Sequence, residues 1–238
     1  MAQPMKLQFT QDVTETSLVK KEILGALRIL ADGRAFRYAR AGSGGVLAGT
    51  LLMAPKSAAG FTDHAATATK TGDRVLSLTL GADVTENAFE DGYLLVCEGP
   101  GAGVQRRILA NAAAPAGADV IVTLAEPLGV ELSASSLITL VPSPWAGLSA
   151  SGQEENVPAG VASCDAGEGR YLWVQTGGPC LCLSSDAAAV GTMMVPGATA
   201  GSLAAMNATL DVDQPVAAVA LAVAGSAGRR RPFFLKID

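Results

Sequence analysis

Aromatic residues are scarce in this chain of 238 residues, at 5%, and histidine occurs once, at His64. Charged residues make up 16% although hydrophobic residues reach 49%, so the apolar content comes mostly from Ala, Val and Leu. Small side chains bury little area each, and apolar burial contributes roughly 25 cal/mol per Å². A chain of this composition therefore needs many backbone pairings, or partner subunits, to remain folded, which is a first indication of assembly.

Arrangements typical of catalytic sites are also missing. A Ser-His-Asp arrangement would have to use His64, which lies in the small-residue segment TDHAAT with no G-x-S-x-G elbow beside it. Glu86, Glu90 and Asp91 cluster without the aromatic platforms of sugar sites, so we expect turn caps and surface charge. The GPGAG of residues 99–103 joins two strand patterns, whereas a dinucleotide site needs glycines that open a helix. The sequence therefore predicts no catalytic site, no cofactor and no enzyme.

The sequence has no stretch typical of a secretory signal, and its apolar window at 215–225 is too short for a membrane helix. The net charge of −5 disfavours nucleic-acid binding, because phosphate neutralisation needs a concentrated basic face. The one dense basic cluster, Arg229, Arg230 and Arg231, is interpreted as a solvated turn; the alternative is an ionic contact to an acidic neighbouring subunit. We expect a protein made in a cytoplasm, with no membrane and no direct nucleic-acid partner.

Four cysteines occur, at Cys97, Cys164, Cys180 and Cys182. In a reducing compartment they are expected to be thiols. Cys180 and Cys182 share one face if their segment is a strand, but a zinc site would prefer a C-x-x-C pair with further cysteine or histidine ligands. We therefore expect structural thiols and no metal.

The segment ADGRAFRYARAG, residues 31–42, is the clearest local signal, because Asp-Gly between apolar runs is typical of a hairpin. It predicts a strand at 26–31, a turn, and a second strand at 34–40. On the second strand Phe36 and Tyr38 share a face, and Arg37 lies on the other. The preceding residues 17–30 also fit a helical stripe, although Gly25 interrupts it, so at most one helical turn is expected there.

Further alternating apolar stretches recur along the chain between Gly and Pro turns, with almost no helix signal. They are RVLSLTLGAD, the strand–turn–strand FEDGYLLVCEGPGAGVQRRIL, DVIVTLAEPL, SSLITLVPSPW, RYLWVQTGGPCLCLSS as a pair of strands, VAAVALAVAG and PFFLKID. This pattern predicts an all-β fold of sandwich-like or barrel-like modules with many short antiparallel strands. We expect an extended, irregular N-terminal arm at 1–20, a first β module at 21–147, a linker at 148–160 and a second β module at 161–238.

The ordered set of these motifs resembles the capsid decoration (cement) proteins of tailed bacteriophages. The resemblance rests on DGRAFRYARAG followed by GTLL, AFEDGYLLVCEGPGAGVQRRI, LVPSPWAGL, RYLWVQTGGP, AVGTMMVPGATAG and the closing PFFLKID. It extends over roughly residues 24–238, and its most specific element is WVQTGGP. The sequence departs from the family in its Ala-rich character and in the cysteines that follow the Gly-Gly-Pro segment.

The resemblance implies a structural virion protein that binds the outer surface of a phage capsid as a homotrimer and stabilises contacts between major capsid protein subunits. Its partners would be itself and the major capsid protein. The residues that we predict at contact surfaces are Arg34, Phe36, Arg37, Tyr38, Arg40, Trp145, Trp173, Gln175, Arg229, Arg230 and Arg231. For Phe36 the simplest interpretation is a core residue, and for Arg37 and Tyr38 the alternative is a plain role in the core and at the surface.

Two other classes of function remain open from the sequence. A head-fibre or receptor-binding adhesin would recognise a host-surface glycan or protein, and it would be expected to show a repetitive shaft and more exposed aromatic residues. A β-sandwich hydrolase would need carboxylates or a histidine that converge in a cleft.

Overall fold

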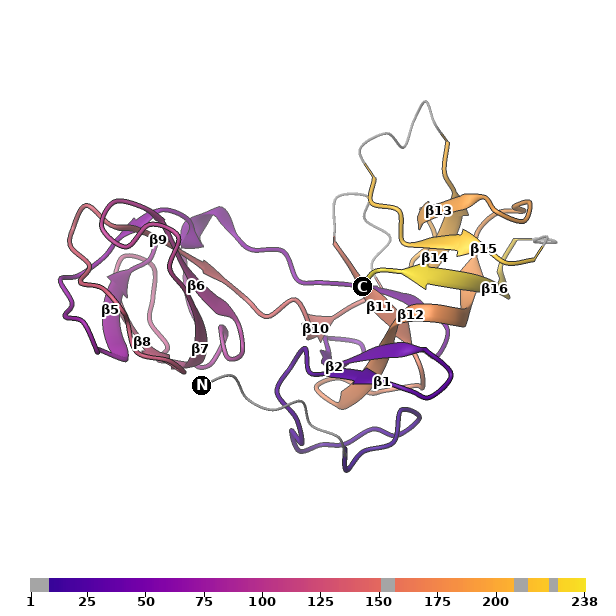
Figure 1. The fold of residues 1–238 in the computed structure, drawn as a ribbon, viewed down its shortest axis with the longest axis horizontal. Coiled ribbons are helices and arrows are strands. Elements are labelled where there is room, and N and C mark those ends of the chain that lie inside the picture. The colour runs from indigo at the N-terminus through magenta and orange to yellow at the C-terminus, as the bar shows by residue number, and fades with distance from the viewer. Residues whose placement is uncertain (1–8, 151–156, 208–213, 223–226) are drawn as a thin grey trace. The chain divides into compact units, whose positions relative to one another are not determined.

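The computed structural model describes residues 9–150, 157–207, 214–222 and 227–238. Over these residues the protein is built from strands β1 to β16, and the 3-10 turn η1 (Ala59–Phe61) is the one helical element (Figure 1). The all-β, barrel-like architecture predicted from the sequence is confirmed. The segment 17–30 contains no helix, and the strand β1 (Leu27–Ile29) lies at its end.

The chain forms two compact units, and their boundaries correct the predicted modules 21–147 and 161–238. The inserted unit is Lys56–Ser143, and the discontinuous unit is Met1–Pro55 together with Pro144–Asp238. The predicted linker at 148–160 does not separate modules, because the strands on either side of it belong to one sheet. Residues 151–156 of that linker lie outside the described part of the chain.

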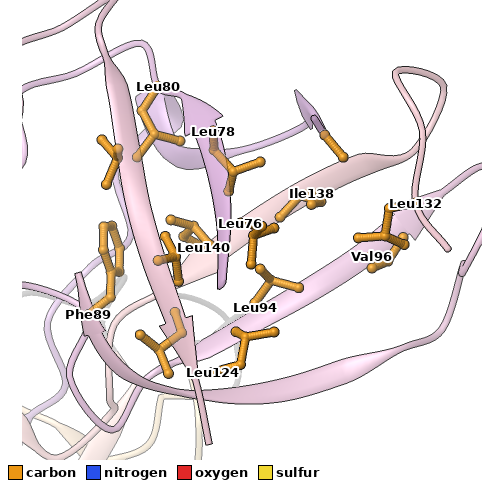
Figure 2. Packing of buried hydrophobic residues seen from close by; sticks show 14 of the residues in the cluster. Leu76, Leu78, Leu80, Phe89, Leu94, Val96, Leu124, Leu132, Ile138 and Leu140 are labelled. Atoms are coloured by element: carbon orange, nitrogen blue, oxygen red, sulfur yellow. The ribbon is translucent and has the colours of Figure 1, made fainter. Parts of the chain in front are cut away.

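The inserted unit is a small antiparallel barrel with the strand order β4-β9-β6-β7-β8-β5. An isolated bridge between Ala66 and Leu78 joins the two ends of this order and so nearly closes the sheet. The strands are β4 (His64–Ala65), β5 (Val75–Thr79), β6 (Tyr93–Glu98), β7 (Gln105–Asn111), β8 (Asp119–Leu124) and β9 (Leu137–Val141). Leu76, Leu94 and Leu140 point into its common interior (Figure 2).

Alternation in the sequence explains this barrel. Leu76, Leu78 and Leu80 are buried while Val75 is exposed, which confirms the predicted two faces of RVLSLTLGAD. The β6–β7 hairpin turns at residues 99–103, as predicted, with Gly99, Gly101 and Gly103 at positive φ.

The discontinuous unit is organised around β12 (Tyr171–Ser184), a single strand of 14 residues where the sequence predicted two. Its first half pairs antiparallel with β2 (Ala35–Ala41), and its second half pairs with β16 (Arg229–Lys236). Gly177 lies opposite both Ala35 and Lys236, so the two pairings meet at this residue, and the register with β2 shifts between Gln175 and Gly177. The Gly-Gly-Pro segment bends the strand but does not end it, because Gly178 takes φ +84° and the pairing with β16 continues through it.

Two rings of strands share β12. One ring runs β2-β12-β11-β3-β10 and closes through a bridge between Met53 and Ser149 and the parallel β10–β2 pairing. The other ring runs β12-β14-β13-β15-β16 and closes on β12 again. Its interior holds Cys182, Phe233 and Leu235, whereas the first ring encloses Leu52, Leu172 and neighbouring small side chains. The remaining bounds are β3 (Leu51–Met53), β10 (Ala146–Leu148), β11 (Pro158–Ala162), β13 (Met193–Pro196), β14 (Ser202–Ala205) and β15 (Ala218–Ala220).

Residues 9–20 pack on this unit's own sheet, which corrects the predicted extended arm as far as the described residues go; residues 1–8 lie outside them. Gln11 is fully buried, and its backbone carbonyl accepts hydrogen bonds from Trp173 Nε1 (3.1 Å) and Arg28 (2.8 Å). Its side-chain amide donates to the carbonyls of Glu15 and Tyr171. The N-terminal segment is thereby a component of the fold.

Candidate docking surface

Four of the residues predicted at contact surfaces are instead buried within their own chain. Phe36, Tyr38 and Trp173 pack in one cluster, and Gln175 is also buried. The Tyr38 and Trp173 rings make an edge contact at 5.1 Å between centroids, while Gln175 Nε2 donates to the carbonyls of Gly177 and Pro179. Tyr38 and Trp173 are completely buried and so have no surface for a partner, while Phe36 and Gln175 border only the pocket described below.

The arginines of β2 are half-buried and mostly engaged within the chain. Arg37 forms an ion pair with Asp238 at 2.7 Å, donates to the Gly25 carbonyl and lies 5.3 Å from the centre of the Trp145 ring. Trp145 in turn lies close over Gly25, where an added Cβ would come within 2.5 Å of the indole. This group fixes β2 to the end of the chain rather than presenting Arg37 to a neighbour.

Arg34 and Arg40 are also half-buried, at opposite ends of β2. The Nε of Arg34 donates to Asp32 at 2.8 Å, and its guanidinium lies 5.7 Å from the centre of the Phe36 ring. Arg40 lies opposite Tyr171 in the β2–β12 register.

Arg229, Arg230 and Arg231 form the first part of β16, which corrects the predicted solvated turn. Their pairing with Ser184, Leu183 and Cys182 of β12 extends the sheet through all three residues. Arg229 and Arg230 are exposed and Arg231 is half-buried.

The strand register of the second ring builds an exposed apolar row that the sequence did not predict. Pro179 of β12 lies opposite Phe234 of β16, Phe234 lies opposite Val219 of β15, and Val219 lies opposite Met193 of β13. Phe234 is 41% exposed and Met193 52%. Because paired residues share a face of a sheet, these side chains form one row across four strands.

A second row lies two residues away on the same face. Leu181 of β12, 60% exposed, lies opposite Pro232 of β16, and the Leu221 amide donates to the Pro232 carbonyl. We call the two rows together the outer apolar face. It consists of Pro179, Leu181, Met193, Val219, Leu221, Pro232 and Phe234. Contiguous exposed apolar surface of this kind marks interaction sites.

The alternation of PFFLKID carries the one sequence signal for this face, since Phe233 and Leu235 point inward while Phe234 points out. Phe234 and Met193 lie in one row only because β13, β15 and β16 pair with one another. These strands are far apart in sequence, so no local pattern could have revealed the row.

A pocket of about 550 Å³ opens beside the outer apolar face, where β2, β11, β12 and β16 meet. Pro179, Leu181 and Pro232 line it and belong to the face as well, while Phe36 and Val161 contribute further apolar surface. Two cations also line it, at Arg34 and Arg230. The full lining is Val13, Thr14, Arg34, Phe36, Ala48, Gly49, Val161, Ala162, Ser163, Gln175, Pro179, Cys180, Leu181, Arg230 and Pro232.

Arg230 is held in place at this pocket by the backbone of residues 48 and 49. Its Nε donates to the Ala48 carbonyl at 2.8 Å. Gly49 has φ +70°, and a Cβ there would lie 2.6 Å from the Arg230 Nε, so only glycine leaves room for the side chain. In the described residues no carboxylate pairs with Arg230, and the residues that line the pocket include no Asp or Glu.

Cys180 is the one titratable group of the lining besides the arginines. Burial raises the pKa of its thiol to about 12, so it is protonated and neutral at physiological pH. Arg34 is paired with Asp32, whereas the positive charge of Arg230 is not offset by a charge from the residues that line the pocket.

The catalytic candidates weighed in the sequence have structural partners in the inserted unit. His64 Nε2 lies 2.7 Å from the Gly60 carbonyl, and Asp91 is buried and forms an ion pair with Arg107 at 2.8 Å. The Asp91 carboxylate thus lies in the interior, which corrects its predicted place at the surface. The described residues contain no group of three or more metal-ligating side chains, and none of their helices is long and apolar enough to span a membrane.

Comparison with family models, with curated proteins and with solved structures finds no match to this chain.

Proposed function

We propose that this protein is a non-enzymatic structural virion protein that binds the outer surface of a phage capsid as a homotrimer and stabilises contacts between major capsid protein subunits. The outer apolar face is the observation that carries the proposal. It offers large apolar side chains to water across four neighbouring strands, and these rigid strands hold the side chains in a fixed arrangement.

The outer apolar face supports a contact between copies of the chain. A stable interface buries about 800 Å² per partner, with an apolar centre and a polar rim. On β16 Pro232 and Phe234 are flanked along the same face by Arg230 and Lys236, which gives such a face a charged border. The small side chains that are abundant in this chain allow the backbones of neighbouring subunits to approach closely.

A trimer acts on a shell through multivalency. Each copy contributes a modest contact, and once one copy is bound the others meet the shell at a high effective concentration. Such a protein stabilises the shell without catalysing a reaction. It requires only that its subunits remain associated.

The first experiment measures mass by light scattering on a size-exclusion column for the native chain, Phe234→Ser and the matched control Ile121→Ser. Ile121 is 52% exposed on β8 of the inserted unit. We expect a mass near three times 24.0 kDa for the native chain and the control, and a smaller mass for Phe234→Ser. Co-sedimentation with empty shells of the cognate major capsid protein should be lost in parallel.

A native chain that is a monomer both free and on shells would overturn the homotrimer. A trimer that does not sediment with shells, but binds to host cells, would favour the adhesin alternative.

A further inference from the structure

The pocket beside the outer apolar face is continuous with it, because Pro179, Leu181 and Pro232 belong to both. Whatever covers the face therefore also covers the mouth of the pocket. Its volume of about 550 Å³ exceeds what one side chain of the surrounding walls could fill, and Phe36 closes it on one side. The face and the pocket thus form one concave docking surface.

The charges of this pocket are of one sign. Arg34 shares its charge with Asp32 through the 2.8 Å ion pair, whereas the one hydrogen bond of Arg230 to a described residue goes to the neutral Ala48 carbonyl. The other guanidinium N–H groups of Arg230 have no hydrogen-bond partner in the described part of the chain, and a carboxylate can accept from two of them in a fork geometry. Arg230 is exposed in the single chain, so a charge-assisted hydrogen bond there gains strength once a docked partner covers the pocket and excludes water.

The chain itself carries a surplus of carboxylates, with 22 Asp and Glu against 17 Lys and Arg. A second copy docked on the outer apolar face is thus complementary to the pocket in charge as well as in apolar character. We propose that the pocket receives a carboxylate side chain of a neighbouring copy, which binds Arg230 while the apolar part of the same segment covers Pro179, Leu181 and Pro232. This inference rests on the contact between copies in the proposed function and names the chemistry of that contact.

The second copy therefore supplies the part of the site that one chain lacks. Arg230 supplies the cation, Gly49 supplies the space in which its side chain lies, and the partner supplies the anion. The contact also selects one register of docking. In a shifted register Arg230 would lose its carboxylate partner, and that carboxylate would be buried without a hydrogen-bond donor.

The test is a dilution series by analytical ultracentrifugation at low ionic strength on the native chain, Arg230→Gln and Arg229→Gln. Arg229 is the matched control, because it is the exposed neighbour on β16, carries the same charge and does not line the pocket. We expect Arg230→Gln to raise the concentration at which the assembly dissociates by about ten- to a hundredfold, the effect of losing a hydrogen bond to a charged group. Arg229→Gln should change it less than about threefold.

Salt and a conservative variant give independent readouts. Added sodium chloride should weaken the native assembly more than the Arg230→Gln assembly, because screening acts on the pair that the variant lacks. Arg230→Lys keeps the cation without the fork, so its dissociation concentration should lie between those of the native chain and Arg230→Gln. Unfolding curves of each variant establish that the fold is retained.

Equal behaviour of Arg230→Gln and Arg229→Gln would overturn the inference. So would an Arg230→Gln assembly of native stability that no longer sediments with shells, because the carboxylate would then come from the shell protein. If Phe234→Ser disrupts the trimer while Arg230→Gln does not, the carboxylate contact fails and the proposed function stands. A native chain that is monomeric throughout would overturn the proposed function itself.

Discussion

The hydroxyl of Tyr38 donates a hydrogen bond of 3.1 Å to the side-chain oxygen of Gln11, and both residues are fully buried. This contact joins the N-terminal segment to the hairpin strand β2. The same Gln11 oxygen also accepts a hydrogen bond from Ser17 at 2.8 Å. The tyrosine of ADGRAFRYARAG thus anchors the preceding segment of its own chain.

Replacing Gln11 with Ala should lower the free energy of unfolding of the discontinuous unit by about 2 kcal/mol, because the Tyr38 hydroxyl and the Tyr171 carbonyl would lose a buried partner. The measurement is urea unfolding followed by tryptophan fluorescence. Both tryptophans of the chain, Trp145 and Trp173, lie in this unit and so report on it alone. The exposed neighbour Thr14, changed to Ala, serves as the control, and a loss no larger than the control's would contradict the role of Gln11.

The ion pair between Arg37 and Asp238 should make stability depend on acid pH. Partial burial is the largest single influence and opposes ionisation of Asp238, but side-chain hydrogen bonding, above all from Arg37, and the charge of Arg37 together outweigh it and hold the pKa of this carboxyl below its ordinary value of 3.8. A lowered pKa means that the folded state gains stability above the ordinary pKa and loses that gain as pH falls through the lowered one. At neutral pH, Asp238→Asn should cost about 1 kcal/mol, since both side chains are partly exposed.

The measurement is the unfolding free energy of the native chain and Asp238→Asn at neutral pH and at successively lower pH below 3.8. The difference between the two proteins should shrink as Asp238 becomes protonated in the folded state. A difference that stays constant into strong acid would show that the pair contributes nothing through its charge.

The four thiols should differ in their reaction with iodoacetamide at mildly alkaline pH. Burial raises the pKa of Cys180 to about 12 and also raises the pKa of Cys164 and Cys182, whereas Cys97 is exposed on β6. Because the thiolate is the reacting form, Cys97 should be alkylated first and the other three slowly until the protein is unfolded. Peptide mass spectrometry after timed quenching identifies the order, and Cys97→Ser should remove the fast phase. Early alkylation of Cys182 would contradict its burial.

Local signals in the sequence predicted the hairpins well. Asp-Gly placed the β1–β2 turn, and alternation placed Leu76 and Leu78 inside the barrel, because both depend on neighbouring residues alone. The continuity of β12 was missed, since a Gly-Gly-Pro segment is typical of a turn unless distant strands hold it extended. The division into units was missed for the same reason: β11 pairs with β3, a strand that precedes the inserted unit.

The candidate docking surface was predicted in part. Arg34 and Arg230 were both expected at contact surfaces, and the structure brings both to the lining of one pocket. Phe36 and Trp173 were predicted at contact surfaces, yet in a chain with so few aromatic residues they are needed in the core. Phe234 and Met193 become neighbours only through the β13–β15–β16 register, which no local pattern encodes.

The position of β12 has a consequence for synthesis on the ribosome. The outer edge of β2 pairs with β12, and the whole inserted unit Lys56–Ser143 is translated between them. Every strand of the inserted unit pairs within Lys56–Ser143, so this unit has all its partners once it has emerged, while β2 waits for a strand that has not yet been made. The nascent chain therefore completes the inserted unit before the discontinuous unit. Until β12 is made, the hairpin of β1 and β2 stays open to proteases and to other chains.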